Sequence, residues 1–378
     1  MNPQVDFISD ADDTLKFTLS NVNVSLANAI RRTILSDIPL VVFKTTPYEE
    51  NKATIIKNTT RLNNEIIKQR LSCIPIHIRN PEDFPLKQYI MEVNVENITD
   101  TTMYVTTENF TIKETVSGKL LEQSKTKEIF PANDYTGSFI DFVRLRPKVF
   151  EDSQNDKIPG EKIHLTCEFS VGTAKEDGCF NAVSNCSYGY TVDDVARDAV
   201  LQKKIQTWKD EGKKEDEVDF ETKNWLLLDG MRIYKKDSFD FAVQTVGVHT
   251  NHELVDKACE ILINRLDEID TIIEKDELQI INSLNTLVNS FDIILENDDY
   301  TIGKIIEYYL YSKFYETDIL TFCGFKKMHP HDPNSIIRVS YKDAVEKSTL
   351  KGHLKECIVT GKQVYTHIRK EILQLVKR

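Results

Sequence analysis

The chain has 378 residues, a length typical of two or three domains, with 48 basic and 60 acidic side chains and a formal net charge of −12. Hydrophobic residues make up 40% and charged residues 29%, which is enough apolar material for a folded core and excludes wholesale disorder. The acidic balance argues against a protein whose main task is to coat nucleic acid, because that task needs a cationic surface. We expect neither a secretory signal nor a membrane-spanning helix, since the sequence has no apolar run suited to either.

The first elements along the chain are a strand and an amphipathic helix. Residues 14–19 (TLKFTL) alternate between apolar and polar side chains, which predicts a half-buried strand. Ser25 is a suitable cap for the helix that follows, and Pro39 ends that helix. The apolar face of this helix contains Leu26, Ala27, Ile30, Ile34 and Ile38, and Arg31 and Arg32 lie beside it.

The middle of the chain has a different composition. Residues 44–160 are rich in Thr, Val, Asn and Ile with alternation, which predicts a strand-rich subdomain inserted after the first helix. Residues 199–236 are dense in charge, and we expect a solvated helix or a mobile loop there. Residues 275–290 have the character of a connection between two halves of the chain.

The region around residue 300 repeats the pattern of the N-terminus. Residues 292–296 (DIILE) predict a strand, a polar turn follows, and Thr301 can cap the next helix. Placing Ser25 over Thr301 aligns the segment SLANAI with TIGKII. This alignment predicts an internal repeat of strand, turn and amphipathic helix.

Each half then ends in a long helix with an apolar stripe. The first stripe contains Leu254, Ala258, Ile261, Leu262, Leu266, Ile269 and Ile273. The second contains Leu350, Leu354, Cys357, Gly361, Val364, Ile368 and Ile372, at spacings close to those of a coiled-coil seam. Two such halves suggest an intramolecular pseudo-dimer. The stripes can also be ordinary core faces, and the two interpretations are compatible because the halves can meet at those faces.

The sequence predicts no metal site. Its seven cysteines are irregularly spaced and form no CxxC pair, which indicates reduced thiols and excludes the usual zinc-binding signatures. The segment MHPHDP offers His329, His331 and Asp332 as metal ligands, but two prolines between strands favour a hairpin turn.

Several segments of the first half resemble blocks of the alpha-like subunits of multisubunit RNA polymerases. These segments are Ser25–Pro39 (SLANAIRRTILSDIP), Ile55–Ile78, Ile140–Lys148 (IDFVRLRPK), Gly172–Tyr188 and Phe239–Leu266. The chain departs from the family pattern at four positions, which are Asn64 in place of Asp, Ser72 and Lys148 in place of Gly, and Asp177 in place of His. The last of the five segments matches the closing strand and dimerisation helix of these subunits.

The C-terminal part resembles the smaller partner subunit of the same superfamily. Asp298–Gly303 (DDYTIG) is similar to its E-D-H-T-L-G-N motif, with Tyr300 in place of His and Lys304 in place of Asn. Phe322–Val339 (FCGFKKMHPHDPNSIIRV) is similar to its hairpin. The chain therefore resembles a fusion of RNA polymerase subunits three and eleven, an arrangement found in large nucleocytoplasmic DNA viruses.

The resemblance implies an α+β fold with two alpha-subunit-type dimerisation domains that form an intramolecular pseudo-dimer, the first interrupted by a strand-rich insertion. The expected domains are 1–43 with 161–275 for the subunit-three-like domain, 44–160 for the insertion and 286–378 for the subunit-eleven-like domain. The expected pseudo-dimer interface contains Leu26, Ile30, Ile34, Ile302, Ile306, Leu262, Leu266, Leu354 and Ile368.

The function implied by the resemblance is a non-catalytic assembly platform of a viral DNA-directed RNA polymerase. Its expected partners are the largest and second-largest subunits and small zinc-binding subunits akin to subunits ten and twelve. Arg31 and Arg32 are expected to dock a large subunit, although charge patterning alone allows a solvent-facing basic pair. Arg70 is expected either to join that surface or to pair internally with a residue such as Glu65.

The resemblance also implies that this chain binds no cofactor or metal, because the catalytic Mg²⁺ is expected on the large subunits. We expect no direct contact with nucleic acid or membrane. The expected location is the viral factory in the host cytoplasm and the virion, with the nucleus as an alternative. The competing functional hypotheses are a nucleic-acid-binding transcription regulator, which the net charge of −12 disfavours, and a stand-alone enzyme with an unrecognised site.

Overall fold

The computed structural model describes residues 2–150, 157–283 and 287–375, which fold as two compact units. We call the first the two-sheet unit; it comprises residues 1–35, 185–244 and 251–378. We call the second the strand-rich unit; it comprises residues 36–184 and 245–250, and the described part of the predicted insertion lies inside it. The predicted domain boundary at residue 286 lies outside the described residues.

The two-sheet unit contains two four-stranded sheets of the same strand order. The first sheet has the order β1-β2-β14-β13, with bounds Gln4–Ala11, Thr14–Ser20, Tyr234–Thr245 and Val183–Val192. The second has the order β15-β16-β18-β17, with bounds Ile280–Asn282, Ser290–Leu295, Ser335–Tyr341 and Leu320–Lys326. In each sheet the second strand pairs antiparallel with both of its neighbours.

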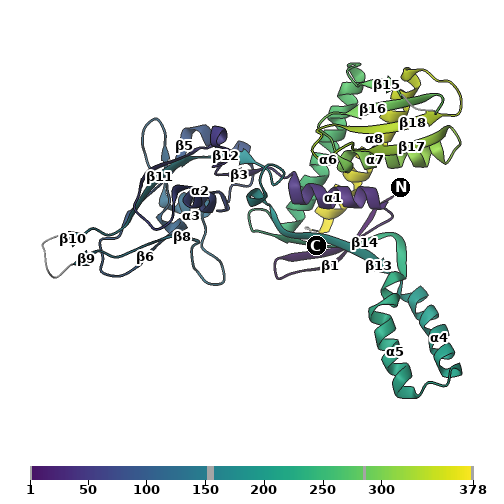
Figure 1. The fold of residues 1–378 in the computed structure, drawn as a ribbon, viewed down its shortest axis with the longest axis horizontal. Coiled ribbons are helices and arrows are strands. Elements are labelled where there is room, and N and C mark those ends of the chain that lie inside the picture. The colour runs from purple at the N-terminus through teal and green to yellow at the C-terminus, as the bar shows by residue number, and fades with distance from the viewer. Residues whose placement is uncertain (1, 151–156, 284–286, 376–378) are drawn as a thin grey trace. The chain divides into compact units, whose positions relative to one another are not determined.

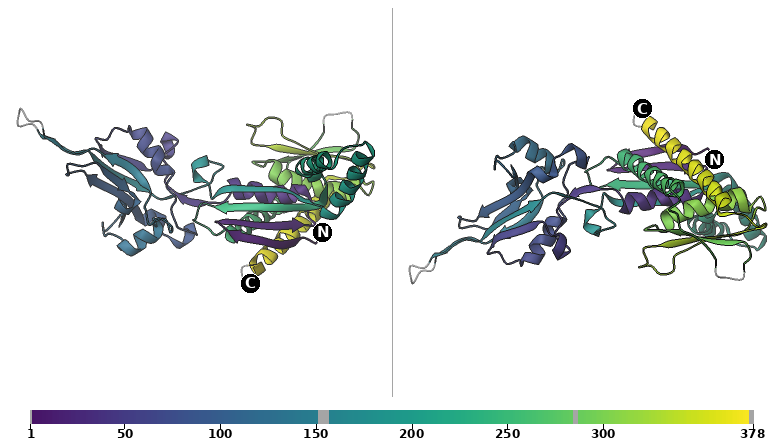
Figure 2. Two further views of the ribbon diagram at one scale, coloured as in Figure 1. Left: turned by 90° about the horizontal axis from the view of Figure 1, so that it is seen from below. Right: turned by 90° about the horizontal axis from the view of Figure 1, so that it is seen from above.

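Each sheet has a short and a long helix at corresponding positions in the chain, the short helix after the second strand and the long helix after the last strand. The helices are α1 (Val24–Ser36) and α6 (Asn251–Glu274) for the first sheet, and α7 (Tyr300–Leu310) and α8 (Lys347–Leu375) for the second. A π-helical turn, Tyr311–Tyr315, continues α7. The long helices α6 and α8 lie against each other, as the right-hand view of Figure 2 shows. None of the described helices combines the length and the apolar character needed to cross a membrane.

A helical hairpin is inserted between β13 and β14 of the first sheet. It consists of α4 (Asp194–Asp210) and α5 (Glu215–Leu227), followed by a 3₁₀ turn at Asp229–Arg232. Figure 1 shows the hairpin projecting beyond the ends of these two strands. The charge-dense segment 199–236, expected to be a solvated helix or a mobile loop, therefore consists mainly of two helices and the start of β14.

The alignment that places Ser25 over Thr301 also relates the backbones of the two halves. It places the first residue of β2 over that of β16, and the first residue of α1 over that of α7. It also places Asn21, with φ of 58°, over Asn297, with φ of 57°. Left-handed backbone at matching positions is informative because few residues other than glycine adopt it. The internal repeat inferred from sequence therefore extends to the turn between strand and helix.

The caps of α1 and α7 lie two residues earlier than predicted. The side chain of Asn23 accepts a hydrogen bond from the backbone N–H of Ser25 at 2.9 Å, and Asp299 accepts one from Thr301 at 2.8 Å. Asn and Asp are among the best capping residues, because their short side chains reach the free N–H groups of the first helical turn. The prediction of Ser25 and Thr301 as caps was wrong by the same shift in both halves.

The core of the first sheet confirms the predicted alternation. In β2, Leu15, Phe17 and Leu19 are at most 1% exposed, whereas the intervening residues reach the surface. Phe17 stacks on Phe241 of β14 with ring centroids 5.1 Å apart. The inward side chains of neighbouring strands thus form one continuous apolar layer.

The strand-rich unit is built around a sheet of the order β4-β11-β5-β7. The bounds of these strands are Ala53–Asn58, Lys162–Glu168, Tyr89–Glu96 and Thr111–Glu114. Three two-stranded sheets pair β3 with β12 (Leu40–Val42, Ser170–Gly172), β6 with β8 (Met103–Thr106, Asp141–Leu145) and β9 with β10 (Val149–Phe150, Lys157–Ile158). Helices α2 (Asn64–Ser72) and α3 (Gln123–Ile129) complete the unit, and an apolar cluster that includes Phe110, Phe130 and Phe142 fills its interior.

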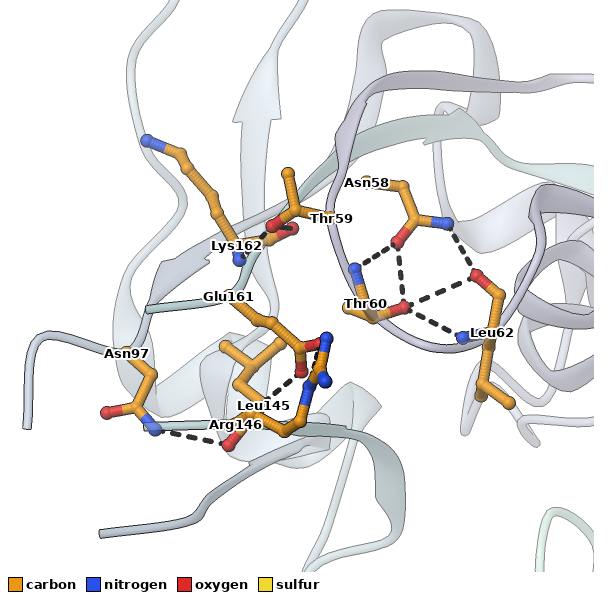
Figure 3. A network of polar contacts seen from close by, with 9 residues as sticks. All are labelled: Asn58, Thr59, Thr60, Leu62, Asn97, Leu145, Arg146, Glu161 and Lys162. Atoms are coloured by element: carbon orange, nitrogen blue, oxygen red, sulfur yellow. Dashed lines mark hydrogen bonds and ion pairs between the residues drawn. The ribbon is translucent and has the colours of Figure 1, made fainter. Parts of the chain in front are cut away.

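Polar turns close one end of this unit (Figure 3). The amide of Asn58 accepts from the N–H and hydroxyl of Thr60 and donates to the carbonyl of Leu62 at 2.8 Å. Asn97 makes the same bonds to Thr99 and to the carbonyl of Thr101. Both Asn-x-Thr triplets therefore serve as side-chain-stabilised turns at strand ends.

Candidate functional site

The helices of the two halves meet at a buried region of the two-sheet unit, which we call the seam. The seam comprises the contacts of α6 and α7 with α8, together with the hydrogen bonds that join α1 to α7 and α8. All nine residues of the predicted interface are at most 4% exposed, namely Leu26, Ile30, Ile34, Ile302, Ile306, Leu262, Leu266, Leu354 and Ile368. Burial of each such side chain contributes about 1.5–3 kcal/mol to the stability of the two-sheet unit.

Helix α8 contacts the other three helices of the seam. A Cβ added at Gly361 would meet Leu266 of α6 at 3.3 Å and Tyr309 of α7 at 3.5 Å, so the absence of a side chain allows this close approach. One turn later, the fully buried hydroxyl of Tyr365 donates to the carbonyl of Leu26 in α1 at 3.4 Å. Burial raises the pKa of Tyr365 well above its ordinary value, and the phenol therefore remains a neutral donor.

Several ion pairs join α8 to α6 and the turn after it, and in each of them the base belongs to α8. Basic side chains lie on α8 and their acidic partners on α6 or in the turn directly after it. The pairs are Arg369 with Asp256, Lys362 with Asp267, Lys355 with Glu274 and Lys351 with Asp276. The partner's residue number falls as the α8 number rises, so the two helices run in opposite directions. Complementary charge of this kind can specify register in addition to packing.

Arg265 of α6 ties the first half to the turn before α7. Its Nε and Nη2 donate to the two carboxylate oxygens of Asp298 at 3.0 and 2.8 Å, and Nη2 also donates to the carbonyl of Glu296. The Asp298 side chain is only 7% exposed, whereas Arg265 is 30% exposed. These hydrogen bonds raise the pKa of Arg265, because they stabilise the charged guanidinium.

Arg32, predicted to dock a large subunit, makes an internal contact at the seam. Its Nη2 lies 2.7 Å from the carboxylate of Asp299, and its Nε donates to the hydroxyl of Thr301 at 2.9 Å. Arg32 therefore connects α1 to the capping residue of α7. The pair is partly exposed, with 36% of the arginine and 27% of the aspartate side chain accessible.

Arg31 points to a different environment. Its Nε donates to Asn28 at 2.9 Å. Its charge also acts on Cys186 and Tyr188 of β13, where burial raises both pKa values and the guanidinium partly opposes that rise. The pKa of Cys186 rises to about 12.

Arg70 belongs to the strand-rich unit, where its side chain binds the backbone of β8. Its Nε donates to the carbonyl of Phe142 at 2.6 Å, and its Nη2 donates to that of Asp141 at 2.8 Å. The guanidinium thus joins α2 to β8 through main-chain oxygens rather than through the internal ion pair suggested with Glu65. The large-subunit role of the three arginines stays a prediction.

The histidine-containing segment forms a turn between β17 and β18. The N–H of Asp332 donates to the carbonyl of His329 at 3.1 Å, as in a tight turn, and the flanking strands pair antiparallel. This confirms the predicted hairpin. In the part of the chain that the structure describes, no group of three or more His, Cys, Asp or Glu residues is arranged to hold a metal ion.

Sequence reasoning missed the polar partners of the seam. Sequence reasoning singled out neither Asp256 nor Arg265 nor Arg369. It named Asp298 and Asp299 only within a family motif, without partners. For Asp299 a signal existed, because a capping carboxylate two residues before Thr301 was visible in the sequence. For the other four, only the packing of distant segments brings the charges together.

Comparison with known proteins assigns the sequence to a family. The model of the RNA polymerase Rpb3/Rpb11 dimerisation domain matches residues 16–266. The chain belongs to this family. The match runs from β2 into α6, and residues after 266 lie outside it.

Several proteins to which this dimerisation-domain protein is similar are RNA polymerase subunits. It is 25% identical over 302 residues to DNA-directed RNA polymerases I and III subunit rpac1 of Dictyostelium discoideum, covering 72% of this chain and 83% of the relative. The corresponding subunit of Mus musculus is 24% identical, covering 72% and 86%. Subunit Rpo3 of Pyrococcus furiosus is 36% identical over 73 residues, covering 19% and 25%.

Proposed function

We propose that this chain is the non-catalytic assembly platform of a multisubunit DNA-directed RNA polymerase of a large nucleocytoplasmic DNA virus. In this proposal it joins a subunit-three-like domain and a subunit-eleven-like domain in one polypeptide. The single observation that carries it is the seam, in which two halves of equal topology bury their helices against each other. Membership of the Rpb3/Rpb11 dimerisation family supports the assignment of the first half.

The second half lies outside the family match, and its assignment rests on repeated geometry. It has the same strand order and the same succession of short and long helix as the first half. Fusion offers a physical advantage, because a short connection holds the two halves at an effective concentration on the order of mM. The platform would then form by folding, without a separate association step.

The proposed partners are the largest and second-largest polymerase subunits and small zinc-binding subunits akin to subunits ten and twelve. Catalytic Mg²⁺ and nucleotide chemistry belong to the large subunits in this proposal, and the chain acts in the viral factory and virion. Of the predicted docking arginines, Arg32 and Arg70 bind groups on other elements of their units, whereas Arg31 donates to Asn28 of its own helix. We therefore assign docking of the second-largest subunit chiefly to Arg31.

Cutting the chain tests the pseudo-dimer. Cleavage at an engineered protease site between Glu274 and Ile280 opens the connection between α6 and β15. We expect the two fragments to stay together on gel filtration, because the apolar seam and its ion pairs remain. Separation of the fragments at micromolar concentration contradicts the pseudo-dimer.

A charge swap in the cleaved protein shows whether the seam holds the fragments. Asp256→Arg faces Arg369 with a like charge and should weaken reassociation, since their bidentate contact at 2.7 and 3.0 Å is lost. Adding Arg369→Asp should restore much of it. Failure of the second substitution to rescue the first argues against the observed helix register.

Docking is tested by co-expression with the two large subunits. Arg31→Ala should leave the chain folded and reduce co-purification of the second-largest subunit. Arg32→Ala is the internal comparison, because its expected effect is on the thermal stability of the two-sheet unit. Unchanged co-purification with Arg31→Ala removes the docking assignment but leaves the pseudo-dimer intact.

A further inference from the structure

The helical hairpin α4–α5 has a small core for its length. Its large buried side chains are Leu201 of α4 and Val218 and Trp225 of α5. Short helices gain most of their stability from packing an apolar face rather than from intrinsic propensity. Two helices held together by so few buried side chains therefore gain substantially if a third element covers them.

More large apolar side chains are exposed on the surface of this hairpin and of the turn after it than are buried in its core. Phe220 and Leu227 of α5 are 69% and 77% exposed, and Leu228 and Met231, which follow directly, are 60% and 54% exposed. Phe220 and Leu227 are seven residues apart, which places them on the same side of α5. Contiguous exposed apolar surface on a folded protein commonly marks a contact with a partner.

The surface around these side chains is acidic. Asp216 and Lys223 lie four and three residues from Phe220 and therefore share its side of α5. Asp219 lies at the edge of that side, three residues from Asp216 and four from Lys223, so the surface carries two carboxylates and one ammonium. Asp216 and Asp219 are exposed and form no ion pair or hydrogen bond with any described residue. We call this surface, from Asp216 through Phe220 and Leu227 to Met231, the outer face of α5.

Two further acidic side chains near the start of α5 have partners within the hairpin. Lys213 pairs with Glu221 at 2.9 Å, and Glu217 accepts from the backbone N–H of Lys214 at 2.9 Å. The carboxylates of the outer face therefore stay available for an external cation. Charge complementarity then requires a partner that is both apolar and basic.

We propose that the outer face of α5 binds a basic amphipathic helix of another polymerase subunit, which completes a three-helix arrangement with α4 and α5. An amphipathic helix fits because its apolar stripe can cover Phe220 and Leu227 while its Lys or Arg residues reach Asp216 and Asp219. This inference rests on the proposed function. It gives the charge-dense insertion a role that the seam does not supply.

The test places a photo-crosslinking amino acid at Leu227 in the full chain, co-expressed with the two large polymerase subunits. We expect crosslinks to a Lys- or Arg-bearing helix of another polymerase chain. A crosslinker at Val116, which is 93% exposed in the strand-rich unit, is the matched control and should give no such product. Crosslinking only to a second copy of this chain, to a segment without basic residues or to nothing in the assembled complex overturns the proposal.

Substitutions give an independent measurement of the same contact. Phe220→Asp with Leu227→Asp should lower the affinity for the crosslinked subunit by about tenfold or more, because the two apolar side chains that the partner covers are lost. Asp219→Lys should lower it by about threefold or more and change its salt dependence, without loss of helix content by circular dichroism. Val116→Asp and Asp100→Lys, both at exposed positions, are the controls.

Different measurements refute the proposed function and the proposed role of α5. If wild-type chain does not co-purify with the large subunits, the proposed function fails and this inference fails with it. If it co-purifies while Leu227 gives no crosslink and Asp219→Lys changes nothing, only the role of α5 is refuted.

Discussion

Replacing Arg265 by Met removes the cation from Asp298 while keeping much of the packing of the aliphatic stem. The carboxylate is 7% exposed and loses two charge-assisted hydrogen bonds, which leaves a nearly buried charge without a counter-ion. Breaking a fully buried pair from one side costs about 3–5 kcal/mol. Because Arg265 is 30% exposed and water can reach the vacated site, we expect about 2–3 kcal/mol.

The opposite substitution should cost less, and this asymmetry is the sharper part of the prediction. Asp298→Asn leaves Arg265 with its contacts to Glu268 and to the carbonyl of Glu296, and we expect a loss of about 1 kcal/mol. Thermal and urea unfolding of both single variants and the double variant would measure the coupling. A loss of 2–3 kcal/mol corresponds to a fall in Tm of about 5–10 °C for a unit of this size.

The matched control is Lys355→Met on α8, whose ion pair with Glu274 crosses the same seam. The side chains of Lys355 and Glu274 are 40% and 63% exposed, so the expected loss of unfolding free energy is about 0.5 kcal/mol or less. The reasoning is refuted if Arg265→Met costs no more than this control, or if the two single substitutions at the Arg265 pair are equally destabilising.

Three further predictions concern packing, pH and thiol reactivity. Gly303→Ala in α7 should lower the free energy of unfolding in urea by about 1–3 kcal/mol, because the new Cβ would clash with the ring of Phe325 in β17. Gly352→Ala in α8 should instead raise it slightly, because no other atom lies within 4 Å of the new Cβ. The Arg338 guanidinium holds the pKa of Asp292 below its usual value, so the stability from this pair is complete above about pH 4 and is lost as the pH falls through the lowered pKa. Asp292→Asn should therefore destabilise at pH 7 and flatten the decline of Tm below pH 4; an unchanged acid profile contradicts the assignment. With a thiol reagent on native protein, Cys73 should react first because it is the exposed cysteine of the chain, and labelling of a buried thiol at an equal rate would count against the structure.

The repeat could be predicted from sequence because its signals are local. Alternation marks the strand that carries Phe17, and apolar spacing marks which faces of the helices are buried, since both follow from backbone periodicity. The nine residues of the expected interface, which the family resemblance implied, are all buried. The caps were misplaced because several polar residues precede each helix, and only the backbone geometry shows that Asn23 and Asp299 fill that position.

The partners of the charged side chains could not be predicted from local sequence patterns. Arg32 looked like a surface residue available for docking, yet it binds Asp299, which is 267 positions away in the chain. Arg70 was expected either to join the docking surface or to pair with a residue such as Glu65, and the structure shows it bound to carbonyl groups of β8. Both contacts depend on how distant segments pack, and local spacing carries no information about that.

The sequence by itself determined the repeat, the apolar faces and the resemblance to polymerase subunits, because backbone periodicity and motif order are properties of the chain alone. The tertiary structure decided which charges meet across the seam and which apolar residues stay uncovered. Phe220 and Leu227 illustrate the difference, because side chains of this apolar type are usual in a core, whereas in this fold both lie exposed at the surface. Burial depends on which elements come together, and that is settled only when the whole chain has folded.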